Sequence, residues 1–370
     1  MKKKITLFKT SSSGSNTFIL YKNIPDQIKH KYEIRLADLK DIRTDPTIVQ
    51  SDVFITTHGE YPSSPDKINI ELWHGFPLKG MANMDWNEPA SPESVRNYWA
   101  RVDLIMSYSP LYTTLLNSCM GARIHQYRIT GMPRNDALLN QENEKNLFEL
   151  FPAIKGKKIG FFLPTYRKSP LKPLLNEGDK NEQNIFGLKT FNADKFSDIL
   201  DVLNMVLIVK LHPFEEQFSL LQPDIRKNNG IYFLTDSMLH QNGLDLYELL
   251  GASDLLITDY SSVYFDYLLL DKPIIFLPTD IESYRSKRGF LVEPYEFWAP
   301  GPKAYNQDSL HQAITDAIQH PKTWSENRKA VQSLVHSYFD NQSSTRVWTE
   351  IDRYIEERQI LLEKKKQEEN

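Results

Sequence analysis

The stretch LLITDYSSVYFDYLLLDKPIIF, residues 255–276, holds two short apolar runs with a polar turn and a helical pattern between them. The first run ends at Thr258, and two serines, Ser261 and Ser262, then open the helical stretch. The second run begins only after that stretch. A strand, a helix and another strand in this order predict one unit of a parallel sheet.

The same alternation extends outward through most of the chain. Other short apolar runs, each followed by an amphipathic stretch or a turn, lie at residues 5–8, 52–57, 68–73, 102–108, 124–130, 158–164, 205–211 and 230–235. Continuously apolar strands separated by helices predict an α/β fold whose parallel sheets are covered on both faces.

Length and a polar interval suggest how the chain is divided. A chain of 370 residues is too long for one ordinary core, so two domains are expected. Residues 141–157 turn polar before a new apolar run begins. We therefore expect domains at 1–145 and 146–340, followed by a C-terminal helix or tail at 341–370.

Composition narrows the class of protein. The net charge of −4 provides no overall field that would attract nucleic acid. A single cysteine, Cys119, rules out an internal disulfide and fits a reducing compartment. The chain has no run of 18 uncharged apolar residues and its start does not resemble a signal peptide, so no spanning helix is predicted.

Polar residues gather where predicted strands end, which is where open parallel sheets bind their ligands. In IELWHGFPLKG, residues 70–80, a histidine and then a lysine follow an apolar run. A phosphate-bearing ligand would suit the cations and hydroxyls that follow the other runs. These candidates are His74, Lys79, Arg134, Asp136, Arg167, Lys210, His212, Asp259, Ser261, Ser262 and Arg288.

Each candidate also has a plainer interpretation. Ser261 could cap a helix, and the histidines could be ordinary strand-end residues. Arg134 and Asp136 could form a structural pair in a turn, and Arg167 could be an exposed loop residue. Arg285, Lys287 and Arg288 could belong to a solvated face. The sequence shows no Asp-x-Asp pair at a strand end, no Walker loop and no HExxH, so it demands no metal or cofactor.

Five segments, LWHGFPLK, GMPRND, FLPTYR, KLHP and ITDYSSVYFDYLLLDKPIIF, together resemble the ordered motifs of the CDP-glycerol glycerophosphotransferase family. This family comprises the teichoic acid primases and polymerases of Gram-positive bacteria. The resemblance runs from about residue 50 to residue 302. It implies a GT-B architecture of two Rossmann-like domains around a cleft. It also implies transfer of a polyol phosphate, most simply glycerol phosphate, from a CDP-linked donor to a hydroxyl of a lipid-linked acceptor, releasing CMP.

The resemblance assigns roles residue by residue. His74 matches the family's catalytic histidine on the acceptor side, and His212 matches a second essential histidine at the donor phosphate. Lys79, Arg134 and Asp136 are then acceptor-side residues. The donor-binding residues implied are Arg167, Lys210, Asp259, Ser261, Ser262, Asp280, Arg288 and Glu293. Cytoplasmic location, peripheral on the inner face of the membrane, is implied as well.

The chain departs from the family pattern at four positions. Phe76 and Gly80 replace a small hydroxyl residue and a second lysine, while Tyr166 and Leu291 replace a tryptophan and a tyrosine. These departures leave the polyol and the acceptor open. The sequence also does not determine the oligomeric state or distinguish a primase from a polymerase. Two alternatives remain: a GT-B glycosyltransferase that uses a nucleotide sugar, and a binding relative without catalysis. The nucleotide that is released distinguishes the phosphotransferase, which releases CMP, from the glycosyltransferase, which would release a nucleoside diphosphate.

Overall fold

Two parallel sheets form the framework of the computed structural model, which describes residues 2–59, 66–85, 87–169, 172–176, 178–212, 215 and 230–368. The chain divides into two compact units. Unit 1 comprises Met1–His74, Pro89–Leu139 and His336–Asn370. Unit 2 comprises Gly75–Glu88 and Asn140–Val335.

The sheet of unit 1 has the strand order β2-β1-β3-β4-β5-β6, and all of its pairings are parallel. Five of the strands correspond to predicted apolar runs, whereas β2 was not predicted, because it is only half-buried along most of its length. The strands are β1 (Lys4–Lys9), β2 (Glu33–Asp38), β3 (Val53–Thr56), β4 (Ile68–Glu71), β5 (Leu104–Ser107) and β6 (Tyr127–Ile129).

The sheet of unit 2 has the order β11-β10-β7-β12-β13 and is also parallel throughout. Its strand order reverses between β7 and β12, which is the topological switch point where doubly wound sheets bind ligands. The strands are β7 (Lys158–Leu163), β10 (Met205–Val209), β11 (Ile231–Phe233), β12 (Leu255–Thr258) and β13 (Ile274–Phe276), with a small antiparallel pair β8 (Lys168–Ser169) and β9 (Lys172–Asn176).

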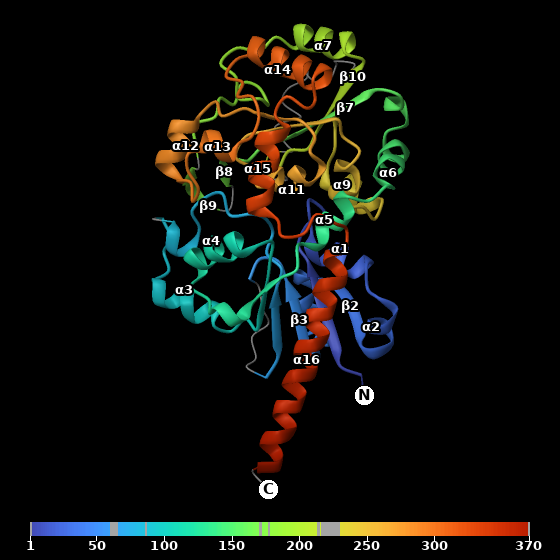
Figure 1. Ribbon diagram of the computed structural model, residues 1–370, viewed down its shortest axis with the longest axis vertical. Coiled ribbons are helices and arrows are strands. Elements are labelled where there is room, and N and C mark those ends of the chain that lie inside the picture. The colour runs from blue at the N-terminus through green and yellow to red at the C-terminus, as the bar shows by residue number, and fades with distance from the viewer. Residues whose placement is uncertain are drawn as a thin grey trace. The chain divides into compact units, whose positions relative to one another are not determined.

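Helices cover both sheets (Figure 1). In unit 1 they are α1 (Asn16–Lys22), α2 (Asp26–Lys31), α3 (Pro92–Trp99), α4 (Pro110–Met120), α5 (Pro133–Leu138) and α16 (Ser343–Glu368). In unit 2 they are α6 (Asn143–Leu150), α7 (Ala193–Val202), α9 (Asp236–Gln241), α10 (Tyr247–Leu250), α11 (Val263–Tyr267), α12 (Ile281–Lys287), α13 (Tyr295–Trp298), α14 (Gln307–Gln319) and α15 (Ser325–Val335). None of the helices described is both long and apolar enough to cross a membrane.

Capping residues set the starts of α3 and α4. The hydroxyls of Ser91 and Ser109 accept hydrogen bonds from backbone N–H groups in the first turns of α3 and α4. Proline follows each cap, since its fixed φ and missing N–H suit the first helical position. In unit 2, Phe196 of α7 and Ile314 of α14 pack with Leu207 into one apolar cluster over the sheet.

Residues 75–88 belong to unit 2, although the sequence predicts one continuous domain from 1 to 145. They pair there with the segment after α12: Leu291 N–H donates to Leu78 O at 2.8 Å. Gly80 fits this pairing because a Cβ on it would lie 2.5 Å from Met84 O. This clash explains the absence of the family's second lysine. Phe76 is buried, with its ring centroid 4.3 Å from that of Phe265, so its departure from the family pattern serves packing within unit 2.

The C-terminal helix α16, predicted as a separate tail, is part of unit 1. Its indole at Trp348 is buried and donates to Leu20 O at 3.1 Å. Asp136 accepts from Ser343 N and Ser344 N, at 2.8 and 2.6 Å, and so caps the start of the helix. Gly131 lies beside this cap and has a left-handed φ of 72°. A Cβ at this position would lie only 2.5 Å from Ser343 Oγ, so the site has no room for a side chain.

Asp136→Ala is expected to lower the free energy of unfolding by about 1–3 kcal/mol, because two buried N–H groups at the start of α16 lose their acceptor. Urea unfolding of the intact chain measures this. Glu363→Ala, which removes an exposed carboxylate from the same helix, serves as the control and should change stability by less than about 0.5 kcal/mol. Equal stabilities for the two variants would show that Asp136 does not anchor α16.

Candidate active site

In unit 1, His74 lies three residues beyond the end of β4, and its side chain is exposed. Its Nδ1 is 3.0 Å from Thr57 O, the carbonyl that follows β3. A carbonyl oxygen only accepts, so Nδ1 of the neutral ring carries the hydrogen. The lone pair is then on Nε2, which leaves this nitrogen able to take a proton from a ligand.

The strand end that carries His74 is held by side chains. Trp73 has a left-handed φ of 53°, a conformation that costs about 1–2 kcal/mol for a residue with a Cβ. Glu71 Oε1 accepts from Trp73 N at 2.6 Å, and Asn16 Nδ2 donates to Trp73 O at 2.8 Å. These bonds offset the strain and fix the backbone before His74.

A second histidine, His58, follows β3 and was not among the predicted site residues. Its ring lies parallel to that of His74, with the centroids 4.3 Å apart and the planes 2° from parallel. A histidine directly after an apolar strand, in DVFITTH, is the same signal that identified His74. That signal could therefore have identified His58 too.

Arg134 and Asp136, predicted on the acceptor side, are both buried. The guanidinium of Arg134 donates to His74 O at 2.7 Å and to Tyr108 Oη at 3.0 Å. Asp136 caps α16 as described above. In the GMPRND motif, Arg134 therefore holds the backbone of His74 and Asp136 holds the start of α16. Neither charge is presented at the surface.

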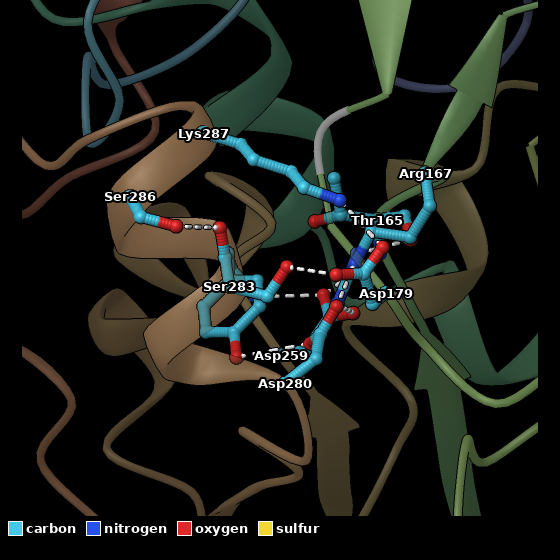
Figure 2. Close-up of polar contacts among 9 residues, drawn as sticks. Thr165, Arg167, Asp179, Asp259, Asp280, Ser283, Ser286 and Lys287 are labelled. Atoms are coloured by element: carbon cyan, nitrogen blue, oxygen red, sulfur yellow. Dashed lines mark hydrogen bonds and ion pairs between the residues drawn. The ribbon is translucent and has the colours of Figure 1, made fainter.

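In unit 2, Arg167 follows β7 and Asp259 follows β12, so the two residues flank the switch point. Figure 2 shows the side chain of Arg167 near Asp259 and Asp280, with which it forms ion pairs. Its Nη2 is 2.9 Å from Asp259, while Nε and Nη2 donate to the two oxygens of Asp280 at 2.8 and 3.0 Å. The three side chains are at most 5% exposed. Arg167 is thus the centre of a buried ion-pair cluster.

Electrostatics keep this cluster charged. Burial alone would raise the pKa of Asp259, but the charges of Arg167 and Lys180 outweigh it and hold that pKa below its usual value. The guanidinium of Arg167 also lies 4.9 and 5.2 Å from the ring centroids of Tyr260 and Tyr284, a cation–π geometry. Burial lowers the pKa of Lys180, a lysine that sequence reasoning missed because no predicted strand precedes it.

The KLHP segment follows β10. Lys210 is buried, donates to Leu211 O at 2.9 Å and pairs with Asp236 at 3.1 Å. The ring of His212 packs on Tyr166, with centroids 4.5 Å apart, and Lys79 Nζ lies 5.6 Å from the centroid of the same tyrosine. Lys79, for which the resemblance implied an acceptor-side role, thus lies in unit 2 beside Tyr166.

Ser261 and Ser262 lie between β12 and α11 and are half-buried. Ser262 is the N-cap residue of α11, but its side chain makes no capping hydrogen bond. The backbone oxygens of the two serines, not their hydroxyls, accept from Tyr264 N and Phe265 N. Simple capping therefore does not account for this serine pair.

Arg288 and Glu293 flank the segment that pairs with residues 78–80. Arg288 forms an ion pair with Asp85. Glu293 accepts from Arg285 Nε at 3.0 Å and from Tyr295 N at 2.8 Å, at the start of α13. Nearby, Asp179 is held by Ser283 at 2.6 Å and by Lys287 of α12 (Figure 2). Both predicted charges, Arg288 and Glu293, thus have a partner of opposite charge within unit 2.

The structure gathers the predicted residues into two sets. His74 and Arg134 lie together in unit 1, while Arg167, Asp259 and Asp280 form one cluster in unit 2. Within the described ranges, no group of three or more His, Cys, Asp or Glu side chains has the spacing of a metal site.

Known proteins resemble this chain over most of its length. The family model described as CDP-glycerol:poly(glycerophosphate) glycerophosphotransferase matches residues 9–353. A teichoic acid poly(ribitol-phosphate) polymerase of Bacillus spizizenii is 27% identical over 282 residues, or 74% of this chain and 40% of that protein. A teichoic acid glycerol-phosphate primase of Bacillus subtilis is 28% identical over 292 residues, or 77% of this chain and 68% of that protein.

Among solved structures, a variant of the wall teichoic acid polymerase TagF soaked with CDPG matches with a TM-score of 0.74. It is 19% identical, and the match covers 96% of this chain and 89% of that one. This likeness, together with two parallel-sheet units, confirms the predicted GT-B class of α/β fold. The family model matches nearly the full length of this chain. The chain therefore belongs to the CDP-glycerol:poly(glycerophosphate) glycerophosphotransferase family.

Proposed function

We propose that this chain transfers a polyol phosphate, with glycerol phosphate as the first choice, from a CDP-linked donor to a hydroxyl of a lipid-linked acceptor, and that it releases CMP. Membership of the family and the names of its teichoic acid relatives support this chemistry. The observation that carries it is the geometry of His74, whose Nδ1 is 3.0 Å from a carbonyl oxygen.

His74 acts as the general base in this proposal. Its Nδ1–H is bonded to Thr57 O, so Nε2 is unprotonated and accepts the proton of the acceptor hydroxyl. The hydroxyl oxygen forms a bond to the phosphorus that carries the polyol. The bond from this phosphorus to the bridging oxygen breaks, and CMP leaves with both electrons of that bond. The products are a new phosphodiester and CMP.

The donor phosphates bind at the switch point of unit 2. Ser261 and Ser262 offer hydroxyls that capping does not use, and parallel sheets bind nucleotides at this position. His212, which stacks on Tyr166, contacts the donor phosphate or protonates the departing CMP. The proposal assigns neutralisation of phosphate charge to side chains and not to a metal.

Arg167 acts through its neighbours rather than on phosphate. Its guanidinium is already bonded to Asp259 and Asp280, and pulling a buried arginine from two carboxylates costs several kcal/mol. Asp259 in turn accepts from Thr165 N at 2.7 Å and from Tyr260 N at 2.6 Å. Arg167 therefore positions the loops after β7 and β12, the second of which carries the serine pair.

The acceptor and the location follow from the same chemistry. A lipid-linked acceptor places the reaction at a membrane surface, and CDP-linked donors are made inside the cell. We therefore place the protein in the cytoplasm, peripheral on the inner face of the membrane.

The nucleotide released tests the function. The purified chain is incubated with CDP-glycerol, CDP-ribitol and a panel of UDP- and GDP-sugars, with and without a lipid-linked acceptor extract, and nucleotides are separated by chromatography. Acceptor-dependent CMP from one CDP-polyol is the expected result and names the polyol. Release of UDP or GDP, with the CDP-polyols intact, would mean that the fold performs glycosyl transfer instead. Parallel reactions with Mg²⁺ or EDTA test the metal-independent chemistry, which predicts equal rates.

The double variant Ser261→Ala/Ser262→Ala is expected to weaken CDP-glycerol binding by about 10- to 100-fold, because two hydrogen bonds to charged phosphate oxygens are lost. Calorimetric titration of the purified chain measures the affinity. Ser333→Ala is the control, since its exposed hydroxyl donates only to Ala330 O on α15. An unchanged affinity in the double variant would place the phosphate contacts on other residues.

A further inference from the structure

Two imidazole rings lie face to face beyond the carboxyl ends of β3 and β4 in unit 1. The centroids of His58 and His74 are 4.3 Å apart, and the planes differ by 2°. Trp73 packs against His74 as well, with its centroid also at 4.3 Å but tilted by 38°. Of these two neighbours, only His58 covers the imidazole in parallel.

The register of the sheet produces this stack. Strands β3 and β4 are parallel neighbours, with Thr56 opposite Glu71. Residues a few positions beyond each strand end therefore emerge side by side. His58 and His74 occupy those positions.

One buried carboxylate fixes both loops. Glu71 Oε2 accepts from Gly59 N, the residue after His58, at 2.8 Å, and from Thr56 Oγ1 at the same distance. Its other oxygen accepts from Trp73 N, the residue before His74. The backbones on both sides of the stack are thus held by a single fully buried side chain.

Thr57 links the two rings. Its carbonyl oxygen contacts His74 Nδ1 at 3.0 Å, and its hydroxyl lies 2.8 Å from His58 Nδ1. A second hydroxyl, Thr10 Oγ1 in the loop after β1, is 3.3 Å from the same nitrogen of His58. His58 is therefore held in plane at its Nδ1 edge by two threonines.

The ring of His58 is uncharged near neutral pH. Although the residue is exposed overall, the loss of water around its ring and the positive charge of Arg134 lower the pKa of His58 to about 4. The charged side chains that hold the two loops are Arg134, which donates to His74 O, and Glu71. Near neutral pH the stack therefore contains at most one charged ring.

We propose that His58 is a positioning residue for His74: its parallel ring fixes the plane of the His74 imidazole and keeps Nδ1–H on Thr57 O. The inference rests on the proposed function, because it takes His74 as the base. A neutral aromatic face also favours the imidazolium that forms when His74 accepts the hydroxyl proton. His58 itself transfers no proton.

The kinetic test compares His58→Ala with His58→Phe, which keeps an aromatic face but has no nitrogen. The alanine variant is expected to lose about 10- to 100-fold in kcat, because the base is no longer aligned, with KM for donor and acceptor nearly unchanged. The phenylalanine variant should recover most of that loss. His125→Ala, an exposed histidine of the same unit, is the matched control.

Other kinetic patterns overturn the proposal. Full activity in His58→Ala would show that the stack does nothing for His74. A rise in KM at constant kcat would make His58 a substrate contact. Equal losses in the alanine and phenylalanine variants would mean that its nitrogens, not its ring face, are required.

A spectroscopic readout separates this inference from the proposed function. In ¹⁵N-histidine-labelled protein, the signal that disappears in His74→Asn belongs to His74, and its nitrogen shifts report the tautomer. We expect the Nδ1–H tautomer in the wild-type chain and a mixture in His58→Ala. An unchanged tautomer in His58→Ala overturns the proposal. Absence of transfer from every CDP-polyol by the wild-type chain overturns the proposed function, while the tautomer still reports on the stack.

Discussion

His74→Ala is expected to transfer polyol phosphate about 10²- to 10⁴-fold more slowly than the wild-type chain, the range that removal of a general base produces. Its affinity for CDP-glycerol should change by less than about threefold, since a base acts on the reacting hydroxyl and not on ground-state donor binding. Nucleotide-release assays give the rate, and calorimetric titration gives the affinity. Both are measured on the same preparation.

The control for this experiment is His125→Ala, which removes an exposed histidine elsewhere in unit 1 and should retain the wild-type rate. A large loss of donor affinity in His74→Ala would contradict the assignment, because it would place His74 among the donor contacts. A wild-type rate would show that another group takes the hydroxyl proton.

Arg167→Ala is expected to lower the free energy of unfolding by about 3–5 kcal/mol at neutral pH, because it leaves two buried carboxylates without their cation. Arg167 is paired with both Asp259 and Asp280, and all three side chains are at most 5% exposed. Urea unfolding measures the loss. Arg285→Ala is the control: its ion pairs with Glu282 and Glu293 are exposed, so it should cost less than about 1 kcal/mol.

The pH dependence of this loss has a definite sign. Asp259 has a folded pKa below its usual 3.8, so the stability that its charge contributes is complete above that pH and is lost as pH falls through the folded pKa. Without Arg167, protonation relieves the buried charge. The difference in the free energy of unfolding between the wild-type chain and Arg167→Ala should therefore become smaller as the pH falls below 3.8.

If Arg167→Ala does not fold, Asp280→Asn tests the same cluster, because it removes one charge while keeping a hydrogen-bonding side chain. A loss of about 1–3 kcal/mol is expected. Wild-type stability in both variants would show that the cluster does not hold the loops after β7 and β12 together. Arg167 would then be available for phosphate, as the sequence suggested.

The strands were predictable because burial on both faces leaves a continuous apolar run. The run MVLIVKL gave β10, whose residues are all buried. The segment EIRLAD did not reveal β2, because a half-buried edge strand keeps charged residues such as Arg35 and Asp38. Burial, and not strand formation as such, is what the sequence pattern detects.

The sequence predicted that the candidate residues follow strands, but it did not predict their partners. His74, Arg167 and Asp259 all follow strands and lie at strand ends as predicted. That Arg167 bonds to Asp259 and Asp280, 92 and 113 residues away, depends on which strands are neighbours. No local period in the sequence records this order, so the sequence could not predict that Arg167 lies in a buried ion-pair cluster.

The assignment of residues 75–88 to unit 2 shows the same limit. The pairing of residues 78–80 with residues 289–291 is long-range, and the segment that makes it is short and irregular. The one sign of this pairing in the local sequence was Gly80, which stands where the family pattern has a second lysine. The structure explains it as a close approach to Met84 O.

The central claim, that the chain transfers a phosphorus and not a sugar carbon, is tested most directly by following that phosphorus. CDP-glycerol labelled with ³²P only at the phosphate attached to glycerol is incubated with the chain and a lipid-linked acceptor extract. We predict that the label passes to the lipid fraction and that the CMP released is unlabelled. Label that remains on the nucleotide, as CDP, would contradict the account, because the bond broken would then lie on the glycerol side of the phosphate.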